Sequence, residues 1–193
     1  MSGNETPELS PVLAAVLEGL GDTVLAWHSQ HGDDTILIQP ADRATVAAYL
    51  KDTESLAFDM LMDSTAVDYE DEEPRFEIVD HFFSTKKHHR LRLKCRVPED
   101  KPNAPSLTPL YGSANWMERE TYDMYGVVFD DHPDLRRILL YPEFVGYPLR
   151  KDYDKLHEQP LFESRYEGVR ETDEKLHPRV GVELPIHGTE VPR

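Results

Sequence analysis

The apolar residues of the first fifty positions switch between helical and strand spacing. Apolar positions three and four residues apart predict a first helix from Ser10 to Leu20, with Ser10 as its N-terminal cap and Gly21 as its end. Two short strands are expected at 23–28 and 35–39, because the turn-forming sequence His-Gly-Asp-Asp lies between these two runs. The chain therefore opens with a helix followed by a strand pair.

A second helix is expected to begin after Asp42, which can cap its free backbone amides. Its inward-facing residues, at helical spacing, are Val46, Ala47 and Leu50. The pattern then changes to two longer strands, at 57–67 and 76–83. An acidic run separates them and consists of Asp68, Glu70, Asp71, Glu72 and Glu73, followed by Pro74. We interpret this run as a solvated hairpin loop, because its carboxylates lack the fixed spacing of a metal site. A metal site is the alternative.

A further strand has two faces of opposite character. Its apolar residues Leu91, Leu93, Cys95 and Val97 alternate with the basic residues Arg90, Arg92, Lys94 and Arg96. One face is expected to pack on the core and the other to form a basic stripe. Cross-strand pairing with acids and protection of a sheet edge explain such a stripe, and docking of an acidic partner is the alternative. His88 and His89 precede the strand and, being adjacent, make a poor metal pair.

The stretch 113–152 organises the rest of the chain. A third helix is expected from Ser113, as its cap, to Tyr125, and Gly126 can take the left-handed conformation that ends it. Prolines and a glycine interrupt the next segment, so only one short helix fits, at about 133–140. The remainder is predicted to be a shaped loop.

Two carboxylates of this third helix are expected to face different surroundings. Glu118 and Glu120 are two residues apart and point to nearly opposite sides, so they cannot form a catalytic pair. Glu120 lies four residues from both Trp116 and Met124, which predicts that it is buried on the apolar face. It would then need a cation, and the candidates are Arg136, Arg137 and Arg150. Arg119 and Asp123 have the spacing of an ordinary helical ion pair.

The order of elements predicts an α+β fold, in which helices pack on one face of an antiparallel or mixed sheet and an extended C-terminal tail follows. We expect an α+β domain at 1–125, a loop region at 126–152 and the tail at 153–193. The tail mixes charges with prolines and has room only for a brief helix at 161–169. It is either a disordered terminus or a segment that orders by lying across partner proteins.

Composition excludes several classes of function. The net charge of -16 argues against binding to nucleic acid or anionic lipid and favours a protein partner. No apolar run is long enough to span a membrane and no signal sequence is present, so a cytoplasmic location is expected. The single cysteine, Cys95, cannot form an internal disulfide or supply the thiolates of an iron–sulfur cluster.

Three blocks in the stretch 118–152 resemble the signature of a known family. They are E-R-E-x-x-D-x-Y-G, H-P-D-L-R-R-I and G-Y-P-L-R-K-D, in this order and spacing. The sequence resembles the C subunit of NADH-quinone oxidoreductase, which is the thirty-kilodalton subunit of respiratory complex I. The resemblance is sharp over 116–152, looser over the preceding hundred residues and not evident in the last forty. One departure is Tyr147, where the family often has histidine.

The resemblance implies a peripheral-arm structural subunit of the proton-translocating NADH:quinone oxidoreductase. Such a subunit packs on the quinone-site D subunit, of about forty-nine kilodaltons, on the cytoplasmic side of the bacterial inner membrane. It supports electron transfer from NADH to quinone (ubiquinone in many respiratory chains) without a redox centre of its own, since FMN and the iron–sulfur clusters belong to partner subunits. No catalytic, cofactor-binding or metal-binding residue is expected here.

The resemblance assigns a set of residues to the family signature and to a subunit interface. These residues are Glu118, Arg119, Glu120, Asp123, Gly126, His132, Pro133, Arg136, Arg137, Gly146, Pro148, Leu149, Arg150, Lys151 and Asp152. Among them, Arg150 is predicted to bind either Glu120 or an acid of the neighbouring subunit bidentately. A homologous subunit of a membrane-bound hydrogenase or related dehydrogenase is the nearer alternative. A stand-alone carboxylate-based hydrolase is the more distant one.

Overall fold

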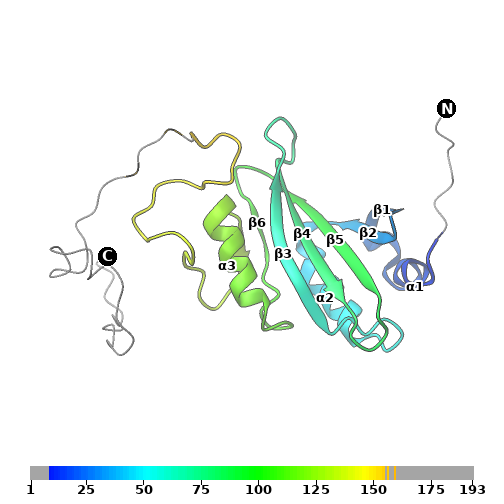
Figure 1. The fold of residues 1–193 in the computed structure, drawn as a ribbon. Coiled ribbons are helices and arrows are strands. Elements are labelled where there is room, and N and C mark those ends of the chain that lie inside the picture. Colours follow the sequence, from blue (N-terminus) through cyan, green and yellow to red (C-terminus); the bar gives the residue numbers. More distant parts are fainter. Residues whose placement is uncertain (1–8, 155, 157–158, 160–193) are drawn as a thin grey trace, which may run out of the picture. The chain divides into compact units, whose positions relative to one another are not determined.

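A computed structural model describes residues 9–154, 156 and 159 (Figure 1). Its helices are α1 (Pro11–Leu20), α2 (Arg43–Asp52) and α3 (Ala114–Tyr125), with short 3-10 turns η1 (Gly21–Thr23) and η2 (Pro40–Asp42). Its strands are β1 (Val24–Gln30), β2 (Asp33–Ile38), β3 (Met60–Asp68), β4 (Phe76–Phe83), β5 (Arg90–Val97), β6 (Asn103–Pro105) and β7 (Val128–Asp130). Within these described residues, no helix has both the length and the apolar character that a membrane span needs.

Five strands form one mixed sheet in the order β1-β2-β5-β4-β3. All neighbours pair antiparallel except β2 and β5, which are parallel and bring Ile36 opposite Leu93. The short strands β6 and β7 pair separately. The hairpin β3–β4 and the strand β5 thus form the antiparallel part of the sheet, and the first hairpin is added beside β5.

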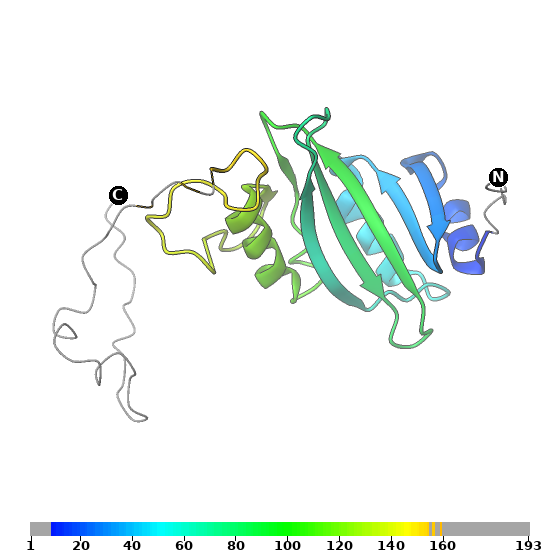
Figure 2. The ribbon, with the colours of Figure 1, turned by 45° about the horizontal axis from the view of Figure 1, so that its top comes forward.

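The helices pack on one face of this sheet, as the sequence predicts. In β4 the inward residues Phe76, Ile78 and Phe82 are fully buried, and the helices contribute the buried side chains of Leu13 and Leu50 to the same core. Figures 1 and 2 show α2 behind the strands and α3 alongside β3. The alternation of apolar and polar residues along the strands produces this one-sided core.

The basic stripe of β5 lies on the other face of the sheet. Lys94 and Arg96 contact Glu77 of β4 with N–O distances of 2.7 and 3.3 Å, and Arg92 lies 3.4 Å from Asp33. Cross-strand pairing with acids is therefore confirmed. Protection of a sheet edge is wrong, because β5 is the central strand.

The predicted helix ends hold only in part. Ser10 accepts a hydrogen bond from Leu13 N and caps α1, and Gly126 ends α3 with φ 78°. Asp42 makes no side-chain cap, and the Ser113 hydroxyl donates instead to the Leu61 carbonyl. No helix forms at 133–140, where the backbone amides bond to a carboxylate of α3 (below).

The brief helix predicted at 161–169 lies outside the described residues, and the division into 1–125, 126–152 and 153–193 stays a prediction.

Candidate functional site

A buried arginine joins α3 to the sheet. Arg43, the first residue of α2, is fully buried and bonds bidentately to Asp80 of β4 with two N–O distances of 2.7 Å. It also bonds to Glu118 at 2.9 Å, to the Pro105 carbonyl at 2.7 Å and to the Ser64 hydroxyl at 3.0 Å. All five guanidinium N–H groups are therefore used. Burial alone would lower the pKa of Arg43, but the charges of the two acids outweigh it and raise that pKa.

Glu118 of α3 is buried against the core, and the sequence-based assignment of Glu120 to the apolar face is wrong. Glu118 is fully buried and accepts additional hydrogen bonds from the Ser106 hydroxyl (2.6 Å) and the Leu107 amide (2.8 Å). Glu120 is exposed, and Trp116 keeps 63% of its surface exposed. The helix turns Glu118 inward because Arg43 lies in the core beneath it. The prediction that an arginine pairs with Glu120 is therefore also wrong.

Asp123 organises the loop that follows α3. Its side chain is buried, and one oxygen, Oδ2, accepts hydrogen bonds from the amides of Ile138, Leu139 and Leu140 at 2.8–3.0 Å. The other oxygen contacts Arg137 at 2.8 Å. Burial would raise the pKa of Asp123, but these hydrogen bonds outweigh burial and hold it below its usual range. These amides therefore donate to the Asp123 carboxylate and not to the backbone carbonyls of the helix predicted at 133–140.

Arg119 does not pair with Asp123, although their spacing allows it. Its guanidinium donates to the carbonyls of Arg136 and Arg137 at 3.1 and 3.3 Å. The ion pair predicted within α3 is therefore wrong, because each partner bonds to the loop instead. Arg136 forms a local pair with Asp134 at 2.6 Å, next to Pro133 on the exposed side of the loop.

Tyr147 lies between two arginines of the signature. Its ring is 5.3 Å from the Arg137 guanidinium and 4.6 Å from that of Arg150. Arg150 also lies 4.8 Å from the Phe76 ring and donates to the Tyr125 carbonyl at 2.6 Å. Arg150 therefore does not bind Glu120, and its bond to an acid of a neighbouring subunit stays a prediction.

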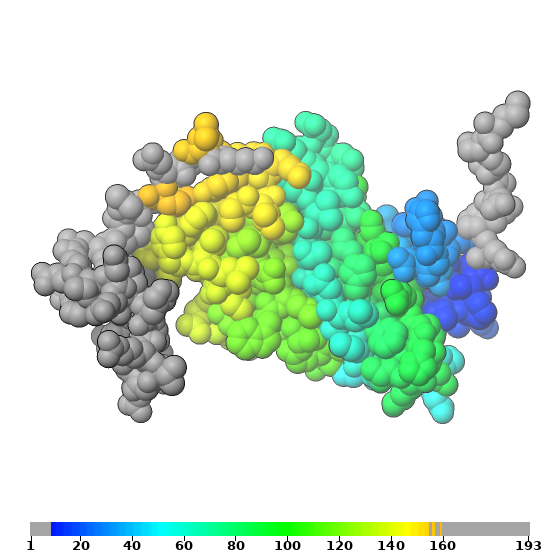
Figure 3. All heavy atoms as spheres, in the orientation of Figure 1, coloured from blue at the N-terminus to red at the C-terminus, as the bar shows by residue number. Residues whose placement is uncertain are grey.

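Gly126 allows the loop to pass close to the end of α3, and Gly146 allows a close contact with Tyr153. A Cβ on Gly126 would lie 2.6 Å from ring carbons of Tyr147, and one on Gly146, whose φ is 93°, would lie 2.9 Å from the Tyr153 ring. The Leu149 amide, after Pro148, bonds to the Met124 carbonyl at 3.1 Å. Figure 3 shows the loop, in yellow, packed directly against the yellow-green surface of α3.

The end of the signature is joined to the sheet by a second group of charges. Arg75 contacts Asp68 at 2.8 Å, Asp152 at 3.0 Å and Glu99 at 2.6 Å. The Lys151 amide also donates to Asp68 at 2.7 Å. The sequence predicted that the whole acidic run is solvated. This is wrong for Asp68, which is buried. Within the described part of the chain, no group of histidine, cysteine, aspartate and glutamate residues could hold a metal ion.

His132 is a hydrogen-bonded structural residue. Its Nε2 lies 3.2 Å from the Asn115 carbonyl, and its Nδ1 accepts a hydrogen bond from the Asp134 amide at 3.0 Å. The ring therefore connects the start of α3 to the loop. This position agrees with an orienting role for the histidine and involves no ligand.

The loop leaves apolar side chains exposed, while Arg137 and Arg150 bond towards α3. Leu139 is 63% exposed, Val145 57%, Leu149 49% and Tyr141 39%. We call these four residues the signature surface. Such an apolar surface, on a backbone held by buried ion pairs, is suited to binding another protein.

The comparisons with known proteins identify the family. The model of the respiratory-chain NADH dehydrogenase 30 kDa subunit family matches residues 36–159. The chain belongs to this family. The C subunit of NADH-quinone oxidoreductase from Caulobacter sp. (strain K31) is 40% identical over 96% of this chain and 92% of its own length. The corresponding protein of Parvibaculum lavamentivorans is 46% identical over 72% of this chain and 68% of its own.

Solved structures agree with this assignment. A trypsin-resistant fragment of Nqo5 matches with a TM-score of 0.56 and 30% identity, over 64% of this chain and 99% of the fragment. A chain of the archaeal membrane-bound sulfane sulfur reductase matches with a TM-score of 0.62 and 26% identity, over 75% of this chain and 85% of its own. The Caulobacter alignment also extends into the last forty residues, because it omits only 4% of the chain. The family similarity there was missed from the sequence alone.

Proposed function

We propose that this chain is a peripheral-arm structural subunit of the proton-translocating NADH:quinone oxidoreductase. It packs on the quinone-site D subunit at the cytoplasmic side of the bacterial inner membrane. Through this contact it supports electron transfer from NADH to quinone and has no redox centre of its own. Membership of the 30 kDa subunit family supports the complex, and the signature surface supports a docking role.

The observation that carries the docking role is that charged and apolar side chains within residues 137–150 have different surroundings. The charged groups bond to this same chain, as in the contact of Arg137 with Asp123 at 2.8 Å and of Arg150 with the Tyr125 carbonyl. Leu139 and Leu149 remain exposed on the fixed backbone. A partner can therefore bind preformed apolar side chains with little loss of backbone entropy.

The absence of a redox centre is supported by the donor atoms themselves. Cys95 is the only cysteine, lies in β5 and is fully buried. Burial raises the pKa of its thiol to about 12, so a thiolate ligand is disfavoured. The iron–sulfur clusters are therefore assigned to partner subunits. FMN is assigned to a partner subunit on the family resemblance, and the purified chain is expected to be colourless.

The docking role is tested by introducing charge into the signature surface. A tagged chain with Leu139→Glu and Leu149→Glu is expected to fold normally, as circular dichroism would show, but to recover little of the D subunit from solubilised membranes. NADH:quinone activity of those membranes should fall in parallel. The control is Leu25→Glu, because Leu25 on β1 is 52% exposed and far from the loop in sequence. Wild-type recovery of the D subunit with the double variant would overturn the proposal.

A membrane-bound hydrogenase-type complex is the second candidate. The similarity to a chain of the sulfane sulfur reductase favours keeping it, since that protein is also part of a respiratory membrane complex. The same purification distinguishes the two, because the companions recovered with the wild-type tagged chain are either NADH dehydrogenase subunits or those of a hydrogenase or reductase.

A further inference from the structure

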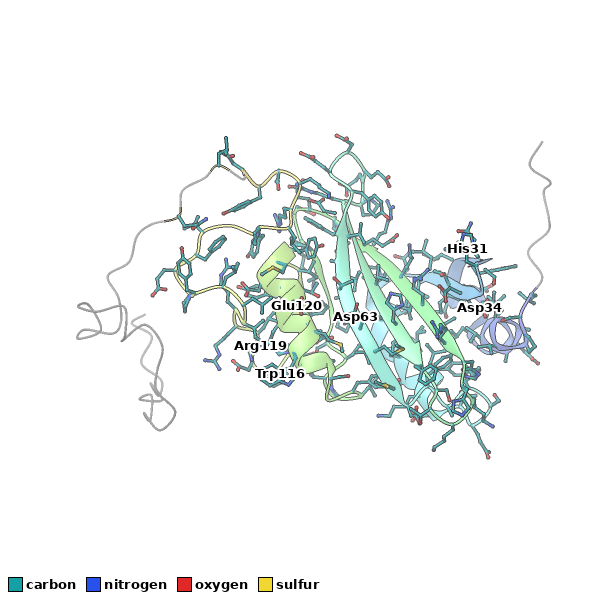
Figure 4. The ribbon with its side chains drawn as sticks, in the orientation of Figure 1. His31, Asp34, Asp63, Trp116, Arg119 and Glu120 are labelled. Carbon is teal, nitrogen blue, oxygen red and sulfur yellow. The ribbon has the colours of Figure 1, made fainter. Side chains whose placement is uncertain are left out.

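One side of α3 is covered only along part of its length. Asp123 lies on the same side of the helix as Trp116 and Glu120, given 100° per residue. The loop covers that side at Asp123 but leaves Trp116 and Glu120 bare. Figure 4 shows Trp116, Arg119 and Glu120 together on α3. This bare part borders the signature surface, because Leu139 bonds to Asp123 at 2.8 Å.

Trp116 is exposed and contacts one arginine of its own helix. Its ring lies 5.7 Å from the Arg119 guanidinium, which is itself bonded to the carbonyls of Arg136 and Arg137. The indole N–H has no acceptor among the described residues, and 63% of the residue's surface is exposed. A tryptophan side chain has only two rotatable bonds, so it loses little entropy when a partner covers it, and tryptophan is among the residues that contribute most to protein interfaces.

Glu120 supplies a charge next to this ring. It is exposed and makes no hydrogen bond or ion pair within the described part of the chain. Two signature cations have other partners: Arg119 donates to backbone carbonyls, and Arg136 pairs with Asp134. A partner that covers Trp116 would therefore have to balance an unpaired carboxylate.

We propose that Trp116 and Glu120 form one anchor for the partner subunit that binds the signature surface. The partner would present an apolar pocket with a hydrogen-bond acceptor for the indole and a lysine or arginine at its rim for Glu120. This inference rests on the proposed docking function and names the chemistry of the partner at that site. A second copy of this chain is disfavoured as the occupant, because each copy has a net charge of -16.

The anchor is tested by the rate at which the tagged chain leaves the assembled complex. Bound chain is exchanged against an excess of labelled free wild-type chain. Trp116→Ala should raise the dissociation rate about 30-fold or more, as expected for a central interface tryptophan. Glu120→Gln should raise it several-fold at low salt and little at high salt, and Glu120→Lys should raise it further. The matched controls are Trp27→Ala and Glu54→Gln, which alter an exposed tryptophan and an exposed glutamate elsewhere.

Fluorescence provides a second measurement. In the Trp27→Phe chain Trp116 is the only tryptophan. Its emission should be that of a water-exposed indole in the free chain and should shift to shorter wavelength in the complex. An unshifted emission on assembly would contradict the anchor. A free chain that already shields Trp116, or that dimerises through it, would also contradict it, because the site would then be occupied by this chain itself.

The two proposals fail in different ways. If Trp116→Ala exchanges like wild type while the Leu139 and Leu149 double variant fails to assemble, the anchor is wrong and the docking function stands. If the double variant assembles normally, the docking function is wrong.

Discussion

The guanidinium of Arg43 and the carboxylates of Asp80 and Glu118 place one positive and two negative charges in the core. All three side chains are fully buried, so their hydration is lost. The arrangement is tolerated because every guanidinium N–H is bonded and Glu118 receives two additional donors. Replacing one member without its partners leaves a buried charge uncompensated, which costs more than the net stabilisation of the pair.

Two variants of Glu118 are expected to lower the free energy of unfolding by different amounts, because one keeps a hydrogen-bond acceptor and the other does not. Glu118→Ala should lower the free energy of unfolding by about 3–5 kcal/mol, because it removes one acceptor of Arg43 and the acceptor of the Leu107 amide. Glu118→Gln should cost about 1–2 kcal/mol, since an amide oxygen can still accept both bonds. Urea unfolding of the purified full chain measures these changes.

Glu120→Ala is the matched control for this pair of variants. It removes a carboxylate from the same helix at an exposed position and should change the free energy of unfolding by less than about 0.5 kcal/mol. A larger loss for Glu120→Ala than for Glu118→Ala would contradict the burial described here.

At the scale of elements, the end of α3 determines the course of the loop. Gly126 stops the helix in a left-handed conformation, and Asp123, one turn earlier, gathers the three amides of 138–140. Tyr147 then returns to within 2.6 Å of the position that a Cβ on Gly126 would occupy. The end of the helix and the loop are therefore packed against each other as one unit.

Gly126→Ala is expected to disturb this unit. The alanine would have φ near 78°, and its Cβ would meet the Tyr147 ring and come within 2.7 Å of Arg150 Nη2. We expect a loss of about 1–3 kcal/mol in urea unfolding, together with faster tryptic cleavage after Arg137. The control is Gly112→Ala, where an added Cβ meets nothing within 4 Å. Equal effects of the two variants would show that the loop does not depend on the helix end.

Across the whole molecule, two buried aspartates join segments that are distant in sequence. Asp68 receives bonds from Arg75 and from the Lys151 amide, and Asp123 receives bonds from the loop. The hydrogen bond from Arg75 lowers the pKa of Asp68 more than burial raises it, so the carboxylate form is favoured in the fold. Both acids therefore stabilise the native state while they are ionised.

The stability of the full chain should consequently fall in acid. Because the pKa of Asp68 and of Asp123 lies below the ordinary value of 3.8 in the fold, their contribution is complete above that value and is lost as pH falls below it, towards the lower folded-state pKa. Thermal or urea unfolding measured between about pH 6 and pH 2 checks this. Asp123→Asn should flatten the slope below pH 4, whereas Asp100→Asn, at an exposed site, should leave it unchanged. An unaltered slope in Asp123→Asn would refute the assignment.

The class of the fold and the family could both be predicted from local sequence patterns. The alternation along β5, the spacing of the apolar residues of α1 and the glycine after α3 depend on neighbours along the chain, and these were predicted correctly. The three signature blocks likewise led to the family that the comparisons show. The helical phase of Arg43 with Val46, Ala47 and Leu50, and the inward phase of Asp80, could also have indicated two buried charges.

The pairing of the buried charges depends on contacts between segments that are distant in sequence. Two stripes of α3, one with Glu118 and one with Glu120, fit helical spacing equally well, and the guanidinium of Arg43 in the core selected the first. Arg119 and Asp123 could pair within the helix, but a loop seventeen residues on offered each of them better partners. Such choices depend on contacts between distant segments, since a buried charge lies where its bonds can be completed.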